Sequence, residues 1–285
     1  MSLLVIEPGL LMLVQDLGRT GSAHLGVPRG GALDAAAAAL ANRLVGNHVE
    51  AAVVELTVTG ARFTAECAVT LATAGSRAEI RVDGRHRGFG QAVWVPAGAS
   101  IDVGPAQDGL RTYLAARGGF AISEVLGSRS TDTLGWIGPG PVRTGDRLPI
   151  GCASGEVPAV EAPAPRRWHG VLRVWPGPRW DWLTASAQKA LMTAEFEVAP
   201  DSDRVAMRLL GAPLERAVTG ELPSEGIPDG GIQVPPSGQP LIFLADHPVT
   251  GGYPVVAVVD PHDLDWCAQL RPGTVLRFAR ARGQG

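Results

Sequence analysis

The sequence predicts a mainly β protein, built from two antiparallel β-rich domains with few helices. Short apolar runs with strand-like patterning recur along the whole chain. The 285 residues include 37 glycines and 23 prolines, a composition that suits many short strands joined by turns. A Pro-rich, unpatterned stretch at 153–166 is expected to link a first domain (1–152) to a second domain (167–285).

The first domain is expected to contain one helix among its strands. Its start, MSLLVIEPGLLMLV, is interrupted by Glu7, Pro8 and Gly9, which predicts two strands around a turn. Asp34 is placed to cap a helix over AAAAALANRLVG, with Gly46 just past its end. The pair Asp83-Gly84 predicts a tight hairpin. Further strands are expected at 53–58, 68–73, 78–82, 91–95, 99–103 and 111–116.

The second domain is expected to add two helices to another strand set. One helix is predicted to start near Asp181 and to run through Leu191. A short helix is predicted over 261–270, because Asp260 can cap it and Pro261 suits its first position. Strands are expected at 171–177, 204–210, 239–246, 254–260 and 274–279.

Charge and lysine content argue against several function classes. The formal net charge is −3 and no basic stripe is interleaved with aromatic residues, so nucleic acid is not an expected partner. Lys189 is the single lysine, and the chain has no G-x-x-x-x-G-K phosphate loop. Any use of ATP by this chain is therefore expected to proceed without that motif.

Other residue spacings disfavour metal, disulfide and triad chemistry. The three cysteines form no C-x-x-C pair, and the six histidines show no H-x-x-x-H or H-x-H spacing. No G-x-S-x-G segment is present, which disfavours a serine triad. Without a basic leader before the apolar start, and without an apolar run of membrane-spanning length, a cytoplasmic location is expected.

Polar side chains gather instead in glycine-rich segments such as VQDLGRTG, GSRSTD, DSDR and LADHPVTGGYP. Carboxylates beside arginines and hydroxyls suit proton transfer and oxyanion stabilisation at an amide or urea-like substrate. Structural alternatives stay open: Asp34 has a helix-capping role available, and Asp246 can end an ordinary strand. The related segments GVPRGG (26–31) and GIPDGG (226–231) are either ligand-facing loops or tight corners of the fold.

Ten segments together resemble one known family over nearly the whole chain. These are QDLGRTG, GVPRGGALD, ANRLVGN, YLAARGGF, LGSRSTD, GDRLP, SDRVAMRL, SEGIPDGGIQVPPSGQPLIFLAD, TGGYPVVAVVD and AQLRPG. The sequence is similar to the biotin-dependent carboxyltransferase family, whose members are variously named allophanate hydrolase subunit 2, KipA and the C subunit of 5-oxoprolinase. The resemblance implies two cyclophilin-like antiparallel β-barrel domains.

The resemblance also implies partners and an activity. It implies one subunit of an ATP-dependent 5-oxoprolinase, acting with a KipI-like subunit and a LamB/YcsF-like subunit, with ATP held by this chain or by a partner. A first alternative is biotin-dependent carboxyl transfer to urea or a related amide, with biotin on a separate carrier protein because Lys189 lacks the biotinyl-lysine context. A second alternative is a non-catalytic KipA-type regulator that binds a histidine-kinase inhibitor.

The residues expected to act lie within these segments. Proton handling is expected of Asp16, Asp34, Glu225 and Asp246. Arg19, Arg129 and Arg204 are expected to hold a carboxylate or a phosphate. The remaining residues expected to line the substrate site are Gln15, Gly30, Gly31, Ser128, Ser130, Ser202, Gly230, Gly231, Gln233, Gly251, Gly252 and Tyr253. No metal ligand is expected among them.

Overall fold

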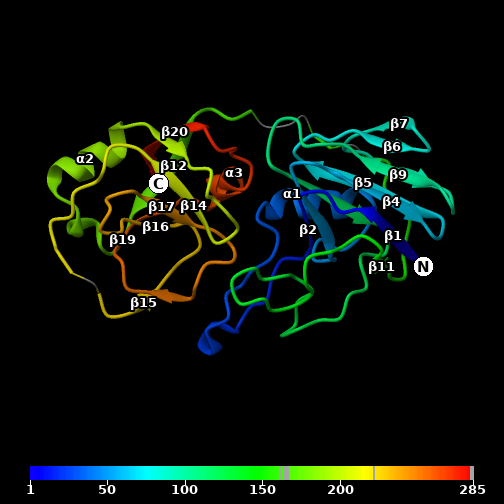
Figure 1. Ribbon diagram of the computed structural model, residues 1–285, viewed down its shortest axis with the longest axis horizontal. Coiled ribbons are helices and arrows are strands. Elements are labelled where there is room, and N and C mark those ends of the chain that lie inside the picture. Colours follow the sequence, from blue (N-terminus) through cyan, green and yellow to red (C-terminus); the bar gives the residue numbers. More distant parts are fainter. Residues whose placement is uncertain (161, 164–166, 221, 283–285) are drawn as a thin grey trace. The chain divides into compact units, whose positions relative to one another are not determined.

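The computed structural model describes residues 1–160, 162–163, 167–220 and 222–282. The chain forms two compact units (Figure 1). Unit 1 comprises Met1–Thr20 and Gly30–Pro165, and unit 2 comprises Gly21–Arg29 and Arg166–Gly285. The sequence placed all of residues 1–152 in the first domain. In the structure, Gly21–Arg29, with its short 3-10 helix Ala23–Leu25, belongs to unit 2 instead. The mainly β fold class is confirmed.

The expected linker at 153–166 lies partly outside the described residues, at 161 and 164–166. Its described part makes contacts within unit 1. The side chain of Arg117 donates hydrogen bonds to the carbonyls of Ser154 and Gly155, and the amide of Ala162 donates to the carbonyl of Gly90 at 2.6 Å. This part of the stretch therefore packs onto the first unit, although its composition alone suggested a free connector.

Unit 1 contains two antiparallel sheets. The six-stranded sheet has the order β11 (Arg147–Pro149), β1 (Ser2–Glu7), β4 (Ala61–Ala65), β9 (Ser100–Val103), β6 (Ile80–Val82) and β7 (Arg85–Gly88). The five-stranded sheet has the order β2 (Leu11–Gln15), β3 (Val53–Thr57), β10 (Arg111–Ala116), β5 (Val69–Gly75) and β8 (Val93–Val95). Asp83 and Gly84 join β6 to β7 with φ of 49° and 72°, so the predicted tight hairpin is confirmed.

The five-stranded sheet is the middle layer of unit 1. Leu114 and Ala116 of β10 face the core shared with the six-stranded sheet, whereas Tyr113 and Ala115 face helix α1 (Ala35–Leu44). This division follows from the two-residue period of a strand, which sends successive side chains to opposite faces. Alanines on both sides of the helix–sheet contact allow α1 to lie close to the sheet.

Helix α1 begins as predicted. Asp34 precedes it, and the Asp34 Oδ1 accepts a hydrogen bond from the amide of Ala37 at 2.9 Å. The amide of Asp34 in turn donates to the hydroxyl of the buried Tyr113 at 2.9 Å. Gly46 follows the helix with φ of 73°, a conformation that glycine adopts without strain. Asp34 thus fixes the start of the helix within the core.

We expect Asp34→Ala to lower the free energy of unfolding by about 1 kcal/mol, because an N-cap carboxylate satisfies an otherwise unpaired amide. Urea denaturation followed by circular dichroism measures the change. The matched control is Arg43→Ala on the exposed face of the same helix, with an expected change within about 0.5 kcal/mol. Equal effects of the two substitutions would contradict the capping role.

Unit 2 is a closed seven-stranded barrel. Its strand order is β12 (Val171–Pro176), β19 (Val255–Val259), β16 (Gly231–Gln233), β17 (Leu241–Phe243), β14 (Ala206–Leu210), β13 (Phe196–Val198) and β20 (Val275–Arg280). All neighbours are antiparallel except β12 and β20, which pair in parallel and close the barrel. A two-stranded ribbon, β15 (Glu225–Gly226) with β18 (Thr250–Gly251), lies outside the barrel order.

The helices of unit 2 differ from prediction at one place. The helix predicted from Asp181 is divided into a 3-10 turn, Trp180–Trp182, and α2 (Ala185–Thr193). Leu183 is extended there and forms a bridge with Arg216, so Thr184 caps α2 instead. The predicted short helix is present as the 3-10 turn Pro261–Asp263 followed by α3 (Leu264–Cys267), with Asp260 as its cap. None of the helices in the described part of the chain could span a membrane.

Candidate functional site

The carboxylate of Asp16 accepts four hydrogen bonds in unit 1. It follows strand β2 and is 8% exposed. Its Oδ1 accepts from the hydroxyls of Ser128 and Ser130 at 2.6 and 2.5 Å, and from the amide of Gly18 at 2.8 Å. Its Oδ2 accepts from the amide of Arg129 at 2.6 Å. Burial alone would raise the pKa of Asp16, but these four donors outweigh burial and lower it below its ordinary value.

Three polar side chains beside this carboxylate have atoms without a partner. Arg19 is 1% exposed, and its guanidinium donates to the carbonyls of Ser130 and Val125. Its Nη1 has no hydrogen-bond partner among the described residues. The same is true of the Oε1 of Gln15 and the Oγ1 of Thr131, although the Nε2 of Gln15 donates to the Thr131 carbonyl at 3.0 Å. Buried polar atoms of this kind usually bind water or a ligand.

A third segment lies against the same turn. The amide of Ala32 donates to the carbonyl of Asp16 at 2.9 Å. A Cβ on Gly31 would lie 2.7 Å from the amide nitrogen of Gly18, so only glycine allows this close approach. Residues 15–19, 30–34 and 128–132 therefore converge, and we call them the three-loop site. Gly30, with φ of 63°, starts the second of these segments.

The two predicted acids of this region have clear structural partners. Asp34 caps α1, and the four donors described above occupy the carboxylate of Asp16. The side chain of the partly buried Arg129 forms an ion pair with Glu124, with Nη1 2.6 Å from Oε1. The assignment of proton transfer to Asp16 and Asp34 stays a prediction.

In unit 2, Asp246 and Arg204 form a buried ion pair. Arg204 Nε lies 2.9 Å from Asp246 Oδ2, and its Nη2 lies 3.1 Å from Oδ1. The two side chains are 3% and 0% exposed. Bidentate pairing of this kind neutralises both charges away from water. The assignment of proton transfer to Asp246, like that of anion binding to Arg204, stays a prediction.

The other predicted residues of unit 2 lie in loops at its strand ends and in its ribbon. Glu225 pairs with Arg179, whose hydrogen bonds lower the pKa of that carboxyl below its ordinary value. Gln233 donates from Nε2 to the carbonyl of Tyr253 at 2.8 Å. The hydroxyl of Ser202 donates to the Ala199 carbonyl at 2.8 Å. The predicted glycines of this unit lie at the ends of β16 and β18 and just beyond them: Gly230, Gly231, Gly251 and Gly252.

One cluster in unit 2 was missed by the sequence reasoning. His247 is buried, its Nε2 lies 2.9 Å from Asp229 Oδ1, and its Nδ1 lies 2.7 Å from the Pro248 carbonyl. Arg29 Nη2 lies 3.0 Å from Asp229 Oδ2. The hydrogen bond from His247 lowers the pKa of Asp229, and the positive charge of Arg29 lowers it further. Burial raises this pKa, but its effect is smaller than that of the two partners. Arg29 and Asp229 are the fourth residues of GVPRGG and GIPDGG, and this shared position was the available signal.

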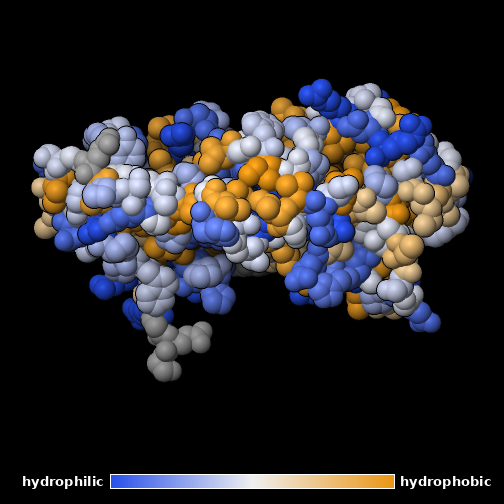
Figure 2. Space-filling view, turned by 90° about the horizontal axis from the view of Figure 1, so that it is seen from below, coloured by the Kyte–Doolittle hydropathy of each residue, from blue (hydrophilic) through white to orange (hydrophobic). Residues whose placement is uncertain are grey.

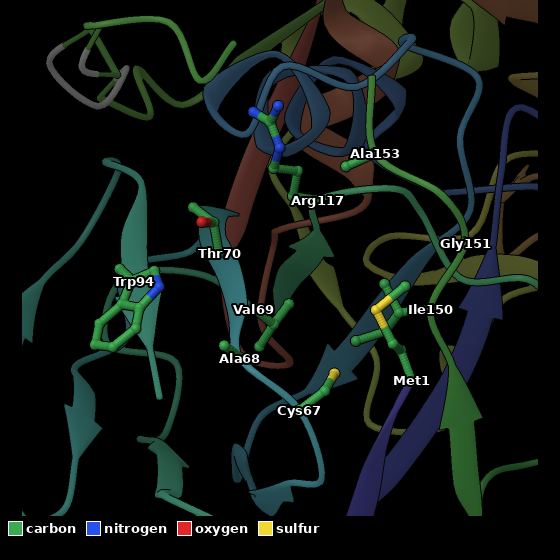
Figure 3. A pocket seen from close by; sticks show the side chains of 10 residues that line it. All are labelled: Met1, Cys67, Ala68, Val69, Thr70, Trp94, Arg117, Ile150, Gly151 and Ala153. Carbon is green, nitrogen blue, oxygen red and sulfur yellow. The ribbon is translucent and has the colours of Figure 1, made fainter. Parts of the chain in front are cut away.

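Two cavities lined by described residues lie elsewhere. One, of about 160 Å³, is in unit 1, with Trp94 and Thr70 on one side and Met1 and Ile150 on the other (Figure 3). The side chain of Arg117 points away from Cys67 there (Figure 3). The second, of about 590 Å³, is in unit 2 and is lined by residues of 213–220 and 236–238. Neither lining includes a predicted site residue.

Comparison with known protein families shows to which family the chain belongs. Residues 25–280 match the family model described as carboxyltransferase domain, subdomain A and B. The match includes both units and most of the three-loop site. The chain belongs to this carboxyltransferase family.

Three relatives of this carboxyltransferase-family chain show how far the likeness extends. It is 33% identical to the 5-oxoprolinase C subunit of Escherichia coli over 279 residues, covering 97% of this chain and 90% of the relative. The protein in the crystal structure of TTHA0988 is 41% identical, with a TM-score of 0.89, but the match covers 98% of this chain and only 55% of that one. The Kluyveromyces lactis urea carboxylase is 27% identical with a TM-score of 0.89, over 97% of this chain and 27% of that one.

Proposed function

We propose that this chain is one subunit of an ATP-dependent 5-oxoprolinase, acting with a KipI-like subunit and a LamB/YcsF-like subunit. The observation that carries the proposal is the match to the 5-oxoprolinase C subunit of Escherichia coli, which extends over 90% of that relative. The urea carboxylase match, in contrast, corresponds to 27% of a much longer chain. The likeness to the oxoprolinase subunit therefore extends over most of both chains.

The chemistry of lactam opening suits the residues of the three-loop site. ATP would supply a phosphoryl group to the amide oxygen of 5-oxoproline, which activates the ring carbonyl carbon toward water. The C–N bond would then break as its nitrogen takes up a proton, and hydrolysis of the resulting acyl phosphate would release phosphate and glutamate. The amide N–H, amide oxygen and carboxylate of this substrate need one acceptor and two donors. Gln15 Oε1, Thr131 Oγ1 and Arg19 Nη1 offer this combination.

The same residues fit ATP poorly. A triphosphate needs several converging cations or backbone amides, whereas the three-loop site offers one guanidinium nitrogen without a partner among the described residues. The sequence also has no phosphate loop, and its single lysine, Lys189, lies exposed on α2. We therefore assign ATP binding to a partner subunit. This chain is expected to position the lactam.

The decisive test measures phosphate and glutamate release from ATP and 5-oxoproline by the chain mixed with its two proposed partners. We expect both products only when all three proteins are present, and no turnover by the chain alone. Mixtures that omit one protein at a time are the controls. Turnover by the isolated chain would contradict the multi-subunit assignment.

A second candidate is the carboxyltransferase half of a biotin-dependent urea or amide carboxylase. The family model's description and the likeness to urea carboxylase favour it. Because Lys189 is the single lysine and lies outside a biotinyl context, a carrier protein would deliver the biotin. Carboxylation of urea by the chain with carboxybiotin and a partner, together with no oxoproline-dependent phosphate release, would favour this candidate over the first.

A further inference from the structure

Three arginines are buried in the described part of the chain, and one of them differs from the other two. Arg204 forms a bidentate pair with Asp246. Arg111 lies with its Nε 3.5 Å from Oε1 of the buried Glu55. Arg19 is the most deeply buried of the three, at 1% exposure, yet no carboxylate of the described residues lies within ion-pair distance of it. Its side-chain hydrogen bonds go to backbone carbonyls alone.

A buried guanidinium without an anion is energetically unfavourable. Asp16 is close in sequence, but four other donors occupy its carboxylate. In the same three-loop site, the Oε1 of Gln15 and the Oγ1 of Thr131 also have no partner among the described residues. Each of the three side chains thus has one atom without a partner among the described residues: a guanidinium nitrogen, an amide oxygen and a hydroxyl oxygen.

We propose that Arg19 is the receptor for the carboxylate of the substrate, and that Gln15 and Thr131 recognise its amide group. The ligand class is a small cyclic amide with a carboxylate next to the ring nitrogen. This inference rests on the proposed function, and it assigns carboxylate binding to one of the three arginines that the sequence predicted to bind an anion. Arg129 and Arg204, the other two predicted anion binders, already pair with Glu124 and Asp246.

The segment 125–138 encloses the guanidinium. The carbonyls of Val125 and Ser130 accept its hydrogen bonds, and a Cβ on Gly138 would lie 3.1 Å from its Nη2. Leu126 and Trp136 in this segment have φ of 53° and 55°, which is strained for such residues, and both side chains are exposed. The three atoms without partners have almost no solvent exposure, so a substrate reaches them only if the residues that cover them move.

The test uses Arg19→Gln, with Arg43→Gln on α1 as a matched exposed control. The melting temperature is measured for the isolated chain and for the three-subunit mixture, with 5-oxoproline or with 2-pyrrolidinone, the same lactam without its carboxylate. We expect 5-oxoproline to raise the melting temperature of the wild type and of Arg43→Gln but not of Arg19→Gln. We expect 2-pyrrolidinone to raise none of them. An equal rise in Arg19→Gln, an equal rise with 2-pyrrolidinone, or no rise in the wild type would overturn the proposal.

Two further readouts keep folding and function apart. Arg19→Met removes an uncompensated buried charge, so we expect the ligand-free melting temperature to stay unchanged or to rise, and a fall would argue for a structural role. In the mixture, Arg19→Gln should lower kcat/KM for 5-oxoproline by about 10–100-fold. Wild-type kcat/KM in this variant would refute the assignment while leaving the proposed function intact. The wild-type mixture could also fail to turn over 5-oxoproline while the ligand still raises the melting temperature through Arg19. That result would refute the proposed function but not the role of Arg19 as carboxylate receptor.

Discussion

Asp246→Ala should lower the free energy of unfolding of unit 2 by about 3–5 kcal/mol, because it removes the carboxylate that forms a buried bidentate pair with Arg204. Urea denaturation followed by tryptophan fluorescence measures the change. The matched control is Asp201→Ala, which breaks an exposed pair with Arg208 and should cost less than about 1 kcal/mol.

A double variant of Arg204 and Asp246 separates the contribution of their charges to stability from that of their packing. In Arg204→Met with Asp246→Leu, both charges are replaced by apolar groups of similar size, and most of the lost stability should return. The opposite result would be a wild-type free energy of unfolding for Asp246→Ala together with loss of oxoproline turnover in the three-subunit mixture. It would show that Asp246 acts in proton transfer and that the ion pair contributes little to stability.

We expect Asp16→Asn to lower the free energy of unfolding by about 2–3 kcal/mol at neutral pH, because it weakens a buried network with four donors. In the variant, the side-chain NH₂ of asparagine takes the place of a carboxylate oxygen. It cannot accept the hydrogen bonds that this oxygen accepts in the wild type, such as the one from the backbone amide of Arg129. Denaturation at a series of pH values measures the effect.

The pH dependence of this variant follows from the lowered pKa of Asp16. A carboxyl whose pKa is lower in the folded state stabilises the protein above its unfolded pKa, which is about 3.9. This stabilisation disappears as the pH falls through the folded value. The wild type should therefore approach Asp16→Asn in stability only below about pH 4. The control is Asp146→Asn in an exposed turn, and a constant gap between wild type and Asp16→Asn at all pH values would contradict the account.

Local signals in the sequence predicted local structure well. The start of α1 at Asp34 and the hairpin at Asp83-Gly84 depend on capping and on positive φ, which neighbouring residues determine. The partition of strands among sheets was not available locally. Strands β1 and β2 are adjacent in sequence yet belong to different sheets, and the parallel closure of β12 on β20 joins segments about a hundred residues apart. Such pairings are determined by burial across the whole unit.

The candidate site shows the same limit. Arg19 and Arg204 look equivalent in sequence, since each lies in a polar segment with glycine or serine and has an aspartate within three residues. The difference between them arises from tertiary contacts, which give Arg204 a buried carboxylate and Arg19 only carbonyl oxygens. Asp229 and His247 were missed for a similar reason, because they are 18 positions apart and are brought together by the pairing of β16 with β17.

On the surface, hydrophobic side chains are interspersed with hydrophilic ones on the face shown in Figure 2. Exposed large apolar residues include four from the segment around the three-loop site: Val125, Leu126, Leu134 and Trp136. Within this stretch, only GSRSTD (127–132) was expected to be polar and glycine-rich, and the sequence did not indicate that the apolar side chains on either side of it are exposed.

The placement of Gly21–Arg29 in unit 2 has a consequence for synthesis on the ribosome. Arg29 is made 200 residues before its ion-pair partner Asp229. At a translation rate of about 5–20 residues per second, this segment waits roughly 10–40 s for the partner to appear. Unit 1 can begin to fold during that interval around a loop whose contacts do not yet exist. A nascent chain halted before residue 229 should therefore be cleaved by protease within 21–29, whereas the finished chain should be protected there.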